Sequence, residues 1–452
     1  MSPNPARFWV CNHLSPIERG PPMITKTLSL KVNSRNALHV AFDVGKSSLD
    51  LYFEVPHALQ ATFQATSSRI PNKPPAILRC LEELGRLAQI NGFDSLFITC
   101  ESTGAYSEKL LRLARQKGHF TAYVSGESVH KLKVVENNDA GKTDTKDPRV
   151  IHMLSRLDKV LRHRSLSGPY LALREFNRAY DEERTHLTSI KGQCHPIIAR
   201  LFCDLEFTSQ FLYQKTGQAL FELFRFNPVK ILAAGQLRFE KSMRKQVPGV
   251  RWETLHKLWD NAKSSCLLYL EEGYQEAMEY RLEGLWARKE IAEKRLQEIH
   301  EKMEGLYNQL VEAGEKVPHV SPGFLSAFRI ARLLGETGPL ADFPDANRLL
   351  RFAGLNLRER KSGQYTGEVH ISKKGRSTLR RVLGETSFGM VKKKAAYGPY
   401  YHAKKAKGMV GSKILAAVER KLLRTFFALG IKCIAFDPGR LSQCESQFKQ
   451  VA

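Results

Sequence analysis

The stretch Ala37–Val55, ALHVAFDVGKSSLDLYFEV, decides how the N-terminal part of the chain is expected to fold. Two runs rich in apolar and β-branched residues flank the polar break Gly45–Ser48, where the glycine permits a turn. This pattern predicts a β-hairpin. Asp43 lies inside the first run, and a carboxylate in so apolar a strand is costly to desolvate unless it is hydrogen-bonded, paired or bound to a metal. Taken alone, Asp43 is more simply interpreted as a residue that caps the turn.

The residues after the hairpin predict an α/β layout, in which helices cover a sheet. After the hairpin comes a polar stretch, Ala61–Pro75, which is expected to end in a loop with three prolines. Alternating helices and strands then follow in the pattern: helix Ala76–Ile90, strand Asp94–Cys100, helix Tyr106–Lys117 and strand His119–Val124. We expect these later strands to return parallel to the first strand.

Three further carboxylates occupy the ends of predicted elements. Glu101 directly follows the strand Asp94–Cys100. In the segment Asn137–Leu154, a polar loop leads into a helix for which Asp144 or Thr145 is a suitable N-cap, and Pro148 fits its first turn. Asp144 and Asp147 are three residues apart at this helix start, so both can face the same point.

The four acids Asp43, Glu101, Asp144 and Asp147 together predict a metal site. In α/β sheets, the carboxyl ends of strands form the crevice where sites are built. Hard oxygen ligands that converge there suit Mg²⁺ or Mn²⁺, which keep some waters and accept a phosphate as a further ligand. Each acid alone is weak evidence, because surface carboxylates are common. The order of the set, in these structural contexts, favours phosphoryl-transfer chemistry.

The strongly positive net charge of the chain indicates that it binds a polyanionic partner. The chain has 452 residues and a net charge of +24, with 70 Lys or Arg against 46 Asp or Glu. Nucleic acid is the usual partner of so basic a chain, and an anionic membrane surface is the competing explanation. No basic amphipathic anchor, membrane-spanning run or signal-peptide core is evident, so we expect a cytoplasmic, nucleoid-associated protein without a membrane partner. The eight cysteines lack zinc-site spacing and fit reduced thiols.

At this length the chain should divide into several domains. We expect a poorly ordered extension at 1–36, an α/β domain at 37–160, a helical region at 170–315, a basic domain at 317–430 and a tail at 431–452. Within the helical region, Trp252–Gly314 interleaves both charges with apolar residues at heptad-like spacing. That spacing is equally compatible with a coiled-coil dimerisation arm and with a helical insertion packed within one chain.

The C-terminal part concentrates the positive charge. The range Lys361–Arg424 carries 16 Lys or Arg against 3 Asp or Glu, which is more than half of the net charge. Tyr397, Tyr400 and Tyr401 are interleaved with these lysines, a pattern that suits backbone contact with base stacking. A solvated basic face is the alternative.

Several blocks resemble the DEDD transposases of the insertion-sequence-one-ten type, which are recombinases guided by a bridge RNA. The matching N-terminal blocks are AFDVGKSSLD, CESTGAYSEKLLRLARQKG and GKTDTKD; the C-terminal blocks are VPHVS, RLLRFAGL and SGQYTGEVHISKKGRSTLRR. They cover roughly Ala37–Arg156 and Val317–Leu423, in the order found in the family.

The resemblance implies a RuvC-like, ribonuclease-H-type N-terminal domain, a helical or coiled-coil middle and a mostly helical C-terminal transposase domain. It implies that Asp43, Glu101, Asp144 and Asp147 are metal ligands and that Ser362 is the nucleophile, through a phosphoserine link to DNA. The acidic pocket and the serine can come from different subunits of a homo-oligomer, a dimer or tetramer. The partners would be element-end DNA, target DNA and a noncoding bridge RNA.

A Gly-flanked serine near lysines can approach a phosphate closely, although an ordinary Ser-Gly turn is the simpler interpretation of Ser362 alone. The expected nucleic-acid-binding residues are Lys142, Lys361, Lys373, Lys374, Arg376, Arg380 and Arg381. Two alternatives stay open: a RuvC-like metal-dependent nuclease that uses water, and a catalytically inactive relative that only binds nucleic acid.

Overall fold

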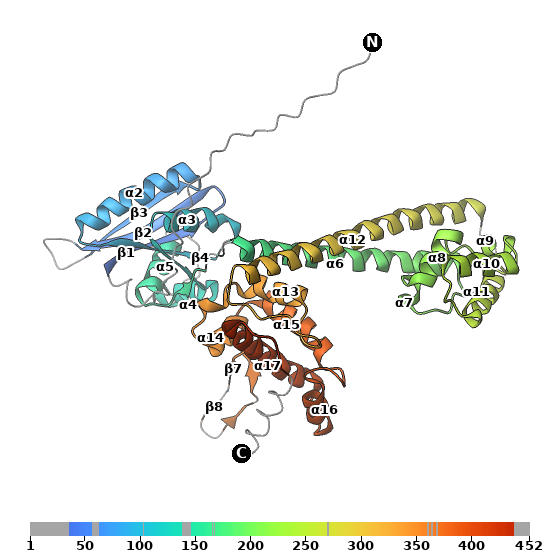
Figure 1. The fold of residues 1–452 in the computed structure, drawn as a ribbon. Coiled ribbons are helices and arrows are strands. Elements are labelled where there is room, and N and C mark those ends of the chain that lie inside the picture. The colour runs from blue at the N-terminus through green and yellow to red at the C-terminus, as the bar shows by residue number, and fades with distance from the viewer. Residues whose placement is uncertain are drawn as a thin grey trace, which may run out of the picture. The chain divides into compact units, whose positions relative to one another are not determined.

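The computed structural model describes residues 36–56, 63–102, 104–137, 146–164, 166, 168–268, 271–358, 361–362, 365–367 and 369–437. The chain divides into two compact units, Met1–Ser165 and Leu166–Ala452, which Figure 1 shows as a ribbon. In the described residues, no helix combines the length and the apolarity needed to cross a bilayer.

Unit 1 is a six-stranded mixed sheet with helices on both faces (Figure 1). Its strands are β1 Ala37–Val44, β2 Ser48–Pro56, β3 Phe63–Pro71, β4 Ser95–Glu101, β5 Phe120–Val124 and the short β6 Leu161–Arg162. Its helices are α2 Pro74–Ile90, α3 Ala105–Gln116, α4 Gly126–Asn137 and α5 Lys146–Arg156. The order across the sheet is β3-β2-β1-β4-β5-β6, with β1, β4 and β5 parallel and the other neighbours antiparallel. This arrangement is consistent with a ribonuclease-H-type domain.

Strand β1 lies inside the sheet and is covered on both faces, which explains why its sequence is almost continuously apolar. Leu38, Val40 and Phe42 pack in one core with α2 and α3. Ala41 faces the other way, into a smaller core with the apolar residues of α5. His39 and Asp43 share the Ala41 face, because alternate residues of a strand point the same way.

The predicted layout has no strand in the polar stretch Ala61–Pro75, and the structure corrects this. Residues Phe63–Pro71 form β3, which pairs with β2 over nine residues, from Pro56 opposite Phe63 to Ser48 opposite Pro71. β3 is an edge strand, so hydrogen bonds to a single neighbour hold it and polar side chains can face solvent. An apolar period is therefore a poor signal for such a strand.

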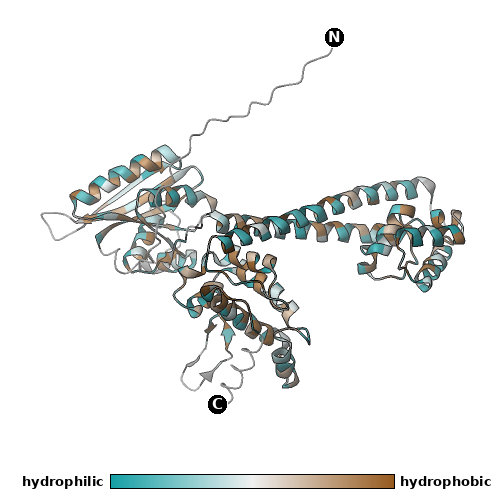
Figure 2. Cartoon of the chain, in the orientation of Figure 1, coloured by the Kyte–Doolittle hydropathy of each residue, from teal (hydrophilic) through white to brown (hydrophobic). Residues whose placement is uncertain are grey.

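Unit 2 is built on two long helices that lie side by side, α6 Gly168–Leu201 and α12 Glu272–Glu312 (Figure 1). Figure 2 shows that both are largely hydrophilic along their length. Between them in sequence lie α7 Ser209–Leu212, α8 Lys215–Phe224, α9 Pro228–Ala233, α10 Gln236–Gln246 and α11 Trp252–Ser265. These helices enclose an aromatic core in which Trp286 of α12 stacks on Phe221 at 4.2 Å between ring centroids.

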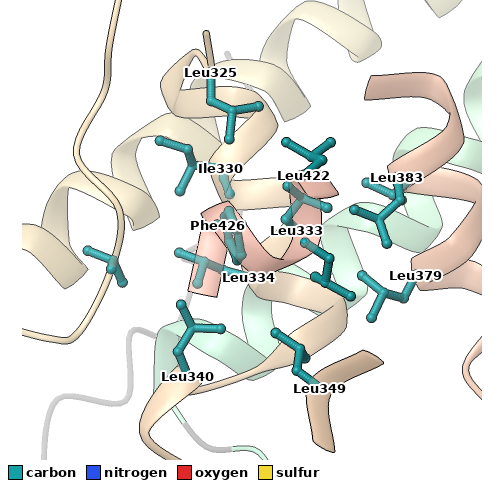
Figure 3. Close-up of a cluster of buried hydrophobic side chains, with 14 of the residues drawn as sticks. Leu325, Ile330, Leu333, Leu334, Leu340, Leu349, Leu379, Leu383, Leu422 and Phe426 are labelled. Carbon is teal, nitrogen blue, oxygen red and sulfur yellow. The ribbon is translucent and has the colours of Figure 1, made fainter. Parts of the chain in front are cut away.

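The C-terminal part of unit 2 is mostly helical, with two small hairpin-like sheets. Its helices are α13 Ala327–Thr337, the 3-10 turn η2 Leu340–Asp342, α14 Ala346–Ala353, α15 Ser377–Met390, α16 Gly398–Ala406 and α17 Gly411–Lys432. The two-residue strands pair as β7 Leu357–Arg358 with β10 His370–Ile371, and β8 Lys361–Ser362 with β9 Tyr365–Thr366. Figure 3 shows leucines of α13, α14 and α15 meeting Leu422 and Phe426 of α17.

The buried residues of α12 contact cores of the same chain. Met278, Leu282 and Leu285 enter the aromatic core, and Met303 and Tyr307 enter the C-terminal core. The helix thus serves as packing surface within one chain over both of these regions.

Candidate active site

Asp43 lies near the end of β1, on the face that α5 covers. Its side chain is half-buried, and Val44 contributes a backbone hydrogen bond to its carboxylate. Burial raises the pKa of Asp43, and the nearby carboxylates of Asp147, Asp50 and Glu101 raise it further. The structure therefore brings three of the four predicted acids into one electrostatic neighbourhood.

Glu101 is placed beside Asp43 by the parallel register of two neighbouring strands. The last registered pair of β1 and β4 is Phe42 with Cys100, so Asp43 and Glu101 are the next residues of these two neighbouring parallel strands, at the same edge of the sheet. Gly126, at the start of α4, lies against the Glu101 carboxylate: a Cβ at this position would clash with Glu101 Oε1. The absent side chain at 126 leaves the space that this carboxylate occupies.

Asp147 enters the same region from the first turn of α5, where the helix N-terminus favours negative charge. Its carboxylate forms an ion pair with Lys133 of α4. Pro148 follows it within the first turn, as its missing N–H allows. Asp144 and Lys142 lie outside the described residues.

Two neighbours of the acids were not predicted from sequence. Asp50 of β2 lies directly opposite Asp43, and Arg69 of β3 neutralises it through two hydrogen bonds of 2.6 and 3.1 Å. The register of the hairpin is the signal that could have placed Asp50. Lys133 has no comparable signal, because it meets Asp147 only through the packing of α4 on α5.

The chemistry of this donor set fits a hard divalent cation in charge and ligand type. All the groups are carboxylates, and their mutual repulsion at Asp43 is the electrostatic state that a cation relieves. In the described residues, no three His, Cys, Asp or Glu side chains are gathered closely enough to hold a metal ion. Lys133 supplies the positive charge at Asp147 in this arrangement.

A buried polar cluster anchors the middle of α5 to the sheet. His39 Nδ1 lies 2.7 Å from Ser155 Oγ, which lies 3.0 Å from Thr99 Oγ1. Burial lowers the pKa of His39 from 6.5 to about 4, and the positive charges of Arg156 and His152 add to this effect. The folded state therefore favours the neutral form of the His39 imidazole over its protonated form.

We therefore predict that acidification destabilises unit 1. Between pH 6.5 and about 4 the unfolded chain binds a proton at His39 that the folded chain does not. This contribution to stability is complete above pH 6.5 and is lost as the pH falls toward 4, by on the order of 1–3 kcal/mol. Between pH 6.5 and about 4, the melting temperature of the His39→Gln variant should fall less steeply with pH than that of the wild type. His402→Gln, at an exposed position of α16, is the control and should keep the wild-type slope.

The backbone of Ser362 lies in β8, opposite Tyr365 of β9. Its side chain and that of Lys361 lie outside the described side chains. The two residues between these strands in sequence, Gly363 and Gln364, lie outside the described residues.

The predicted nucleic-acid-binding residues of the C-terminal part differ in their surroundings. Lys373 and Lys374 are exposed. Arg376 Nε donates to the buried Glu336 at 2.6 Å, and Arg381 forms an ion pair with Asp181 of α6. Arg380 donates to the backbone carbonyls of Ala353 and Gly375 at 2.9 and 3.2 Å. The three arginines therefore make contacts inside unit 2.

The prediction of a stacking role is wrong for Tyr397. Its ring is 2 % exposed, packs against Phe324, and its hydroxyl lies 3.1 Å from Thr425 Oγ1. Tyr400 is half-buried, with Lys421 Nζ 4.5 Å from its ring centroid. Sequence periodicity could not separate these core contacts from a stacking surface.

Two protein-family models match the chain. One, a transposase model of the IS110-type DEDD class, matches residues 40–203 and includes all four predicted acids. The other, described as "Transposase IS116/IS110/IS902 family", matches residues 322–402 and includes Ser362. The two ranges together cover more than half of the chain. No curated protein sequence matches it. From these two matches, which follow one another in chain order, we conclude that the chain belongs to the IS110-type DEDD transposases.

Proposed function

We propose that this transposase cuts and rejoins DNA with an acidic pocket in unit 1 and the hydroxyl of Ser362 in unit 2. The observation that supports this most strongly is the electrostatic influence of neighbouring acids on half-buried Asp43: burial raises its pKa, and the carboxylates of Asp147, Asp50 and Glu101 raise it further. Carboxylates on a protein surface usually lie far enough apart to avoid repulsion. A group of carboxylates that repel one another is typical of a site that binds a cation or takes part in catalysis.

The proposed ligands of a Mg²⁺ or Mn²⁺ ion are Asp43, Glu101, Asp144 and Asp147. When bound, the ion would supply positive charge against the oxygens of a DNA phosphate. Asp43 and Glu101 are held by strands and Asp147 by a helix start, so these rigid elements would orient the carboxylates. When the ion neutralises the charge of the carboxylates, the ion pair between Lys133 and Asp147 would break.

Ser362 is the proposed nucleophile. Its Oγ would form a bond to phosphorus, and the bond between phosphorus and one deoxyribose oxygen would break. The serine proton would pass to the leaving oxygen, which departs as a hydroxyl. Rejoining reverses these steps with the hydroxyl of another strand. The number of phosphate ester bonds is conserved, so no external energy source is required.

The proposed partners are the DNA ends of the mobile element, target DNA and a noncoding guide RNA that selects both by base pairing. A homo-oligomer would allow one subunit to supply the acids and another to supply Ser362. The positive charge of the chain, +24 overall, supports partners that are polyanions.

A strand-breakage assay on element-end DNA, with the flanking noncoding region transcribed, tests this function. Ser362→Ala and Asp43→Ala should each abolish strand breakage, whereas Ser377→Ala, at the start of α15, should not. Breakage that survives Ser362→Ala but not Asp43→Ala would instead identify a water-using nuclease. Wild-type protein that binds DNA but never breaks it, at any divalent ion concentration, would indicate an inactive relative.

The space beside Glu101 gives a second prediction. Gly126→Ala places a methyl group where the Glu101 carboxylate lies, so the carboxylate must move while the backbone need not. We expect strand breakage to fall by about tenfold to a hundredfold, a typical cost of disturbing a ligand shell, with little change in melting temperature. Gly85→Ala, in α2, has open space around its Cβ and is the matched control. Equal activities of the two variants would show that the position of Glu101 does not matter.

A further inference from the structure

The basic C-terminal part contains two kinds of cation. As described above, Arg376, Arg380 and Arg381 contact acids or carbonyls of unit 2. The lysines before α16 and in and after its last turn are different. They lie within the range Thr386–Val418, which contains no Asp or Glu, and six of them are Lys392, Lys393, Lys394, Lys404, Lys405 and Lys407.

Solvent reaches these six lysines. Five are exposed, and Lys404 is half-exposed. No ion pair links any of the six to an acid among the described residues, although the same unit uses many other cations in such pairs. Six ammonium groups close together in sequence, without local neutralisation, repel one another, which costs stability unless an anion is bound.

The backbone that carries these lysines is well packed. Gly398, the first residue of α16, lies against the carbonyls of Lys392 and Lys393, where a Cβ would clash. The amide of Tyr397 donates to the carbonyl of Met390, and its buried ring fixes the start of the helix. α16 packs on α17 at the edge of the C-terminal helices (Figure 1). Three of the lysines, Lys392–Lys394, therefore precede a short, fixed helix, and the other three lie in its last turn and at its C-cap.

We propose that Lys392–Lys394 and Lys404, Lys405 and Lys407, named here the α16 surface, bind the phosphate backbone of duplex DNA. The nine residues of α16 span about 14 Å at 1.5 Å per residue. Over that length a duplex presents about eight phosphate charges, at one per ~1.7 Å of its axis. The inference rests on the proposed function only in taking DNA as the partner, and it assigns binding rather than chemistry.

Duplex DNA fits this surface better than a single strand does. Single-stranded nucleic acids are usually held by free aromatic rings as well as by charge. Tyr397 is buried, and the ring of Tyr400 is covered by the Lys421 ammonium. Tyr401 is half-buried and lies edge-on to His402. Charge without a stacking platform matches a partner whose phosphates are outside and whose bases are paired.

Fluorescence anisotropy of a labelled 30-base-pair duplex, measured from 50 to 300 mM salt, tests the proposal with the full-length protein. Two triple variants, Lys392→Ala/Lys393→Ala/Lys394→Ala and Lys404→Ala/Lys405→Ala/Lys407→Ala, should each weaken binding at least about tenfold at 150 mM salt. The slope of log affinity against log salt should become shallower by about 2 to 3.

The matched control removes three exposed lysines of the same unit, Lys241→Ala/Lys245→Ala/Lys294→Ala, from α10 and α12. It should bind within about twofold of wild type, and all three triple variants should keep the wild-type melting temperature because every changed side chain is exposed or half-exposed. The proposal would be overturned if the α16 variants kept the duplex affinity and the salt dependence of the wild type. It would also be overturned if the control variant lost as much duplex affinity as the α16 variants.

A single-stranded RNA of equal length separates the alternatives. If the α16 variants lose RNA binding and keep duplex binding, the partner of this surface is RNA, and the proposal is wrong. Strand breakage is scored separately. Duplex binding that is weakened in the α16 variants, together with strand breakage that does not depend on Ser362, would refute the proposed function alone. Ser362-dependent breakage with unchanged duplex binding by the α16 variants would refute this inference alone.

Discussion

Replacing Asp43 by asparagine is expected to abolish strand breakage, by at least about a thousandfold, while the protein becomes no less stable. Asn keeps the shape of the side chain but removes the charge that the proposed ion needs. The folded state raises the pKa of Asp43 through burial and through the carboxylates of Asp147, Asp50 and Glu101. The ionised carboxylate is therefore a destabilising group at neutral pH, and its removal relieves that repulsion.

The measurements are the strand-breakage rate and the melting temperature at pH 7.5. The control is Asp94→Asn, an exposed acid just before β4 whose side chain accepts a hydrogen bond from Asn36. It should leave activity unchanged. Loss of both activity and several degrees of melting temperature in Asp43→Asn would indicate that Asp43 is a structural turn residue, the simpler interpretation of its sequence context.

The second large effect is expected at Arg332, in a polar network that joins α6, α13 and α15 within unit 2. Its side chain is 6 % exposed, and its guanidinium donates to Asp181 and Glu385 at 2.7 Å and to Asn177 Oδ1 at 3.2 Å. Arg332→Met should lower the free energy of unfolding of unit 2 by about 3 kcal/mol, because Asp181 and Glu385 lose the most buried of their cationic partners.

The effect should appear as a lower melting temperature and as faster amide exchange in α13 and α15. Arg178→Met is the matched control on α6, since Arg178 forms an exposed ion pair with Glu175. Exposed pairs contribute about 0–1 kcal/mol, so this variant should unfold almost as wild type does. Similar stabilities of the two variants would show that the network is dispensable.

The sequence predicted the parts of unit 1 whose signals are local. The hairpin around Gly45, the parallel return of β4 and β5, and the helix that carries Asp147 all follow from apolar period and turn residues. β3 was missed because an edge strand keeps a polar face and is held by backbone hydrogen bonds to one neighbour. Such a strand becomes evident only when its partner is known.

The candidate site shows the same division. Asp43, Glu101 and Asp147 could be predicted because each sits at the end of a recognisable element. The ion pair of Asp147 with Lys133 and the role of Gly126 beside Glu101 depend on the packing of α4, which no local pattern specifies. Likewise, sequence spacing could not distinguish the arginines that hold unit 2 together from the lysines that face solvent.

The most direct test of the proposed chemistry is detection of the covalent link. The protein is incubated with element-end DNA, the noncoding RNA and Mg²⁺, denatured, digested with protease and analysed by mass spectrometry. A nucleotide attached to the peptide that contains Ser362, absent from Ser362→Ala, is the predicted result. Cleaved DNA with no attached peptide, formed equally well by the Ser362→Ala variant, would contradict serine catalysis.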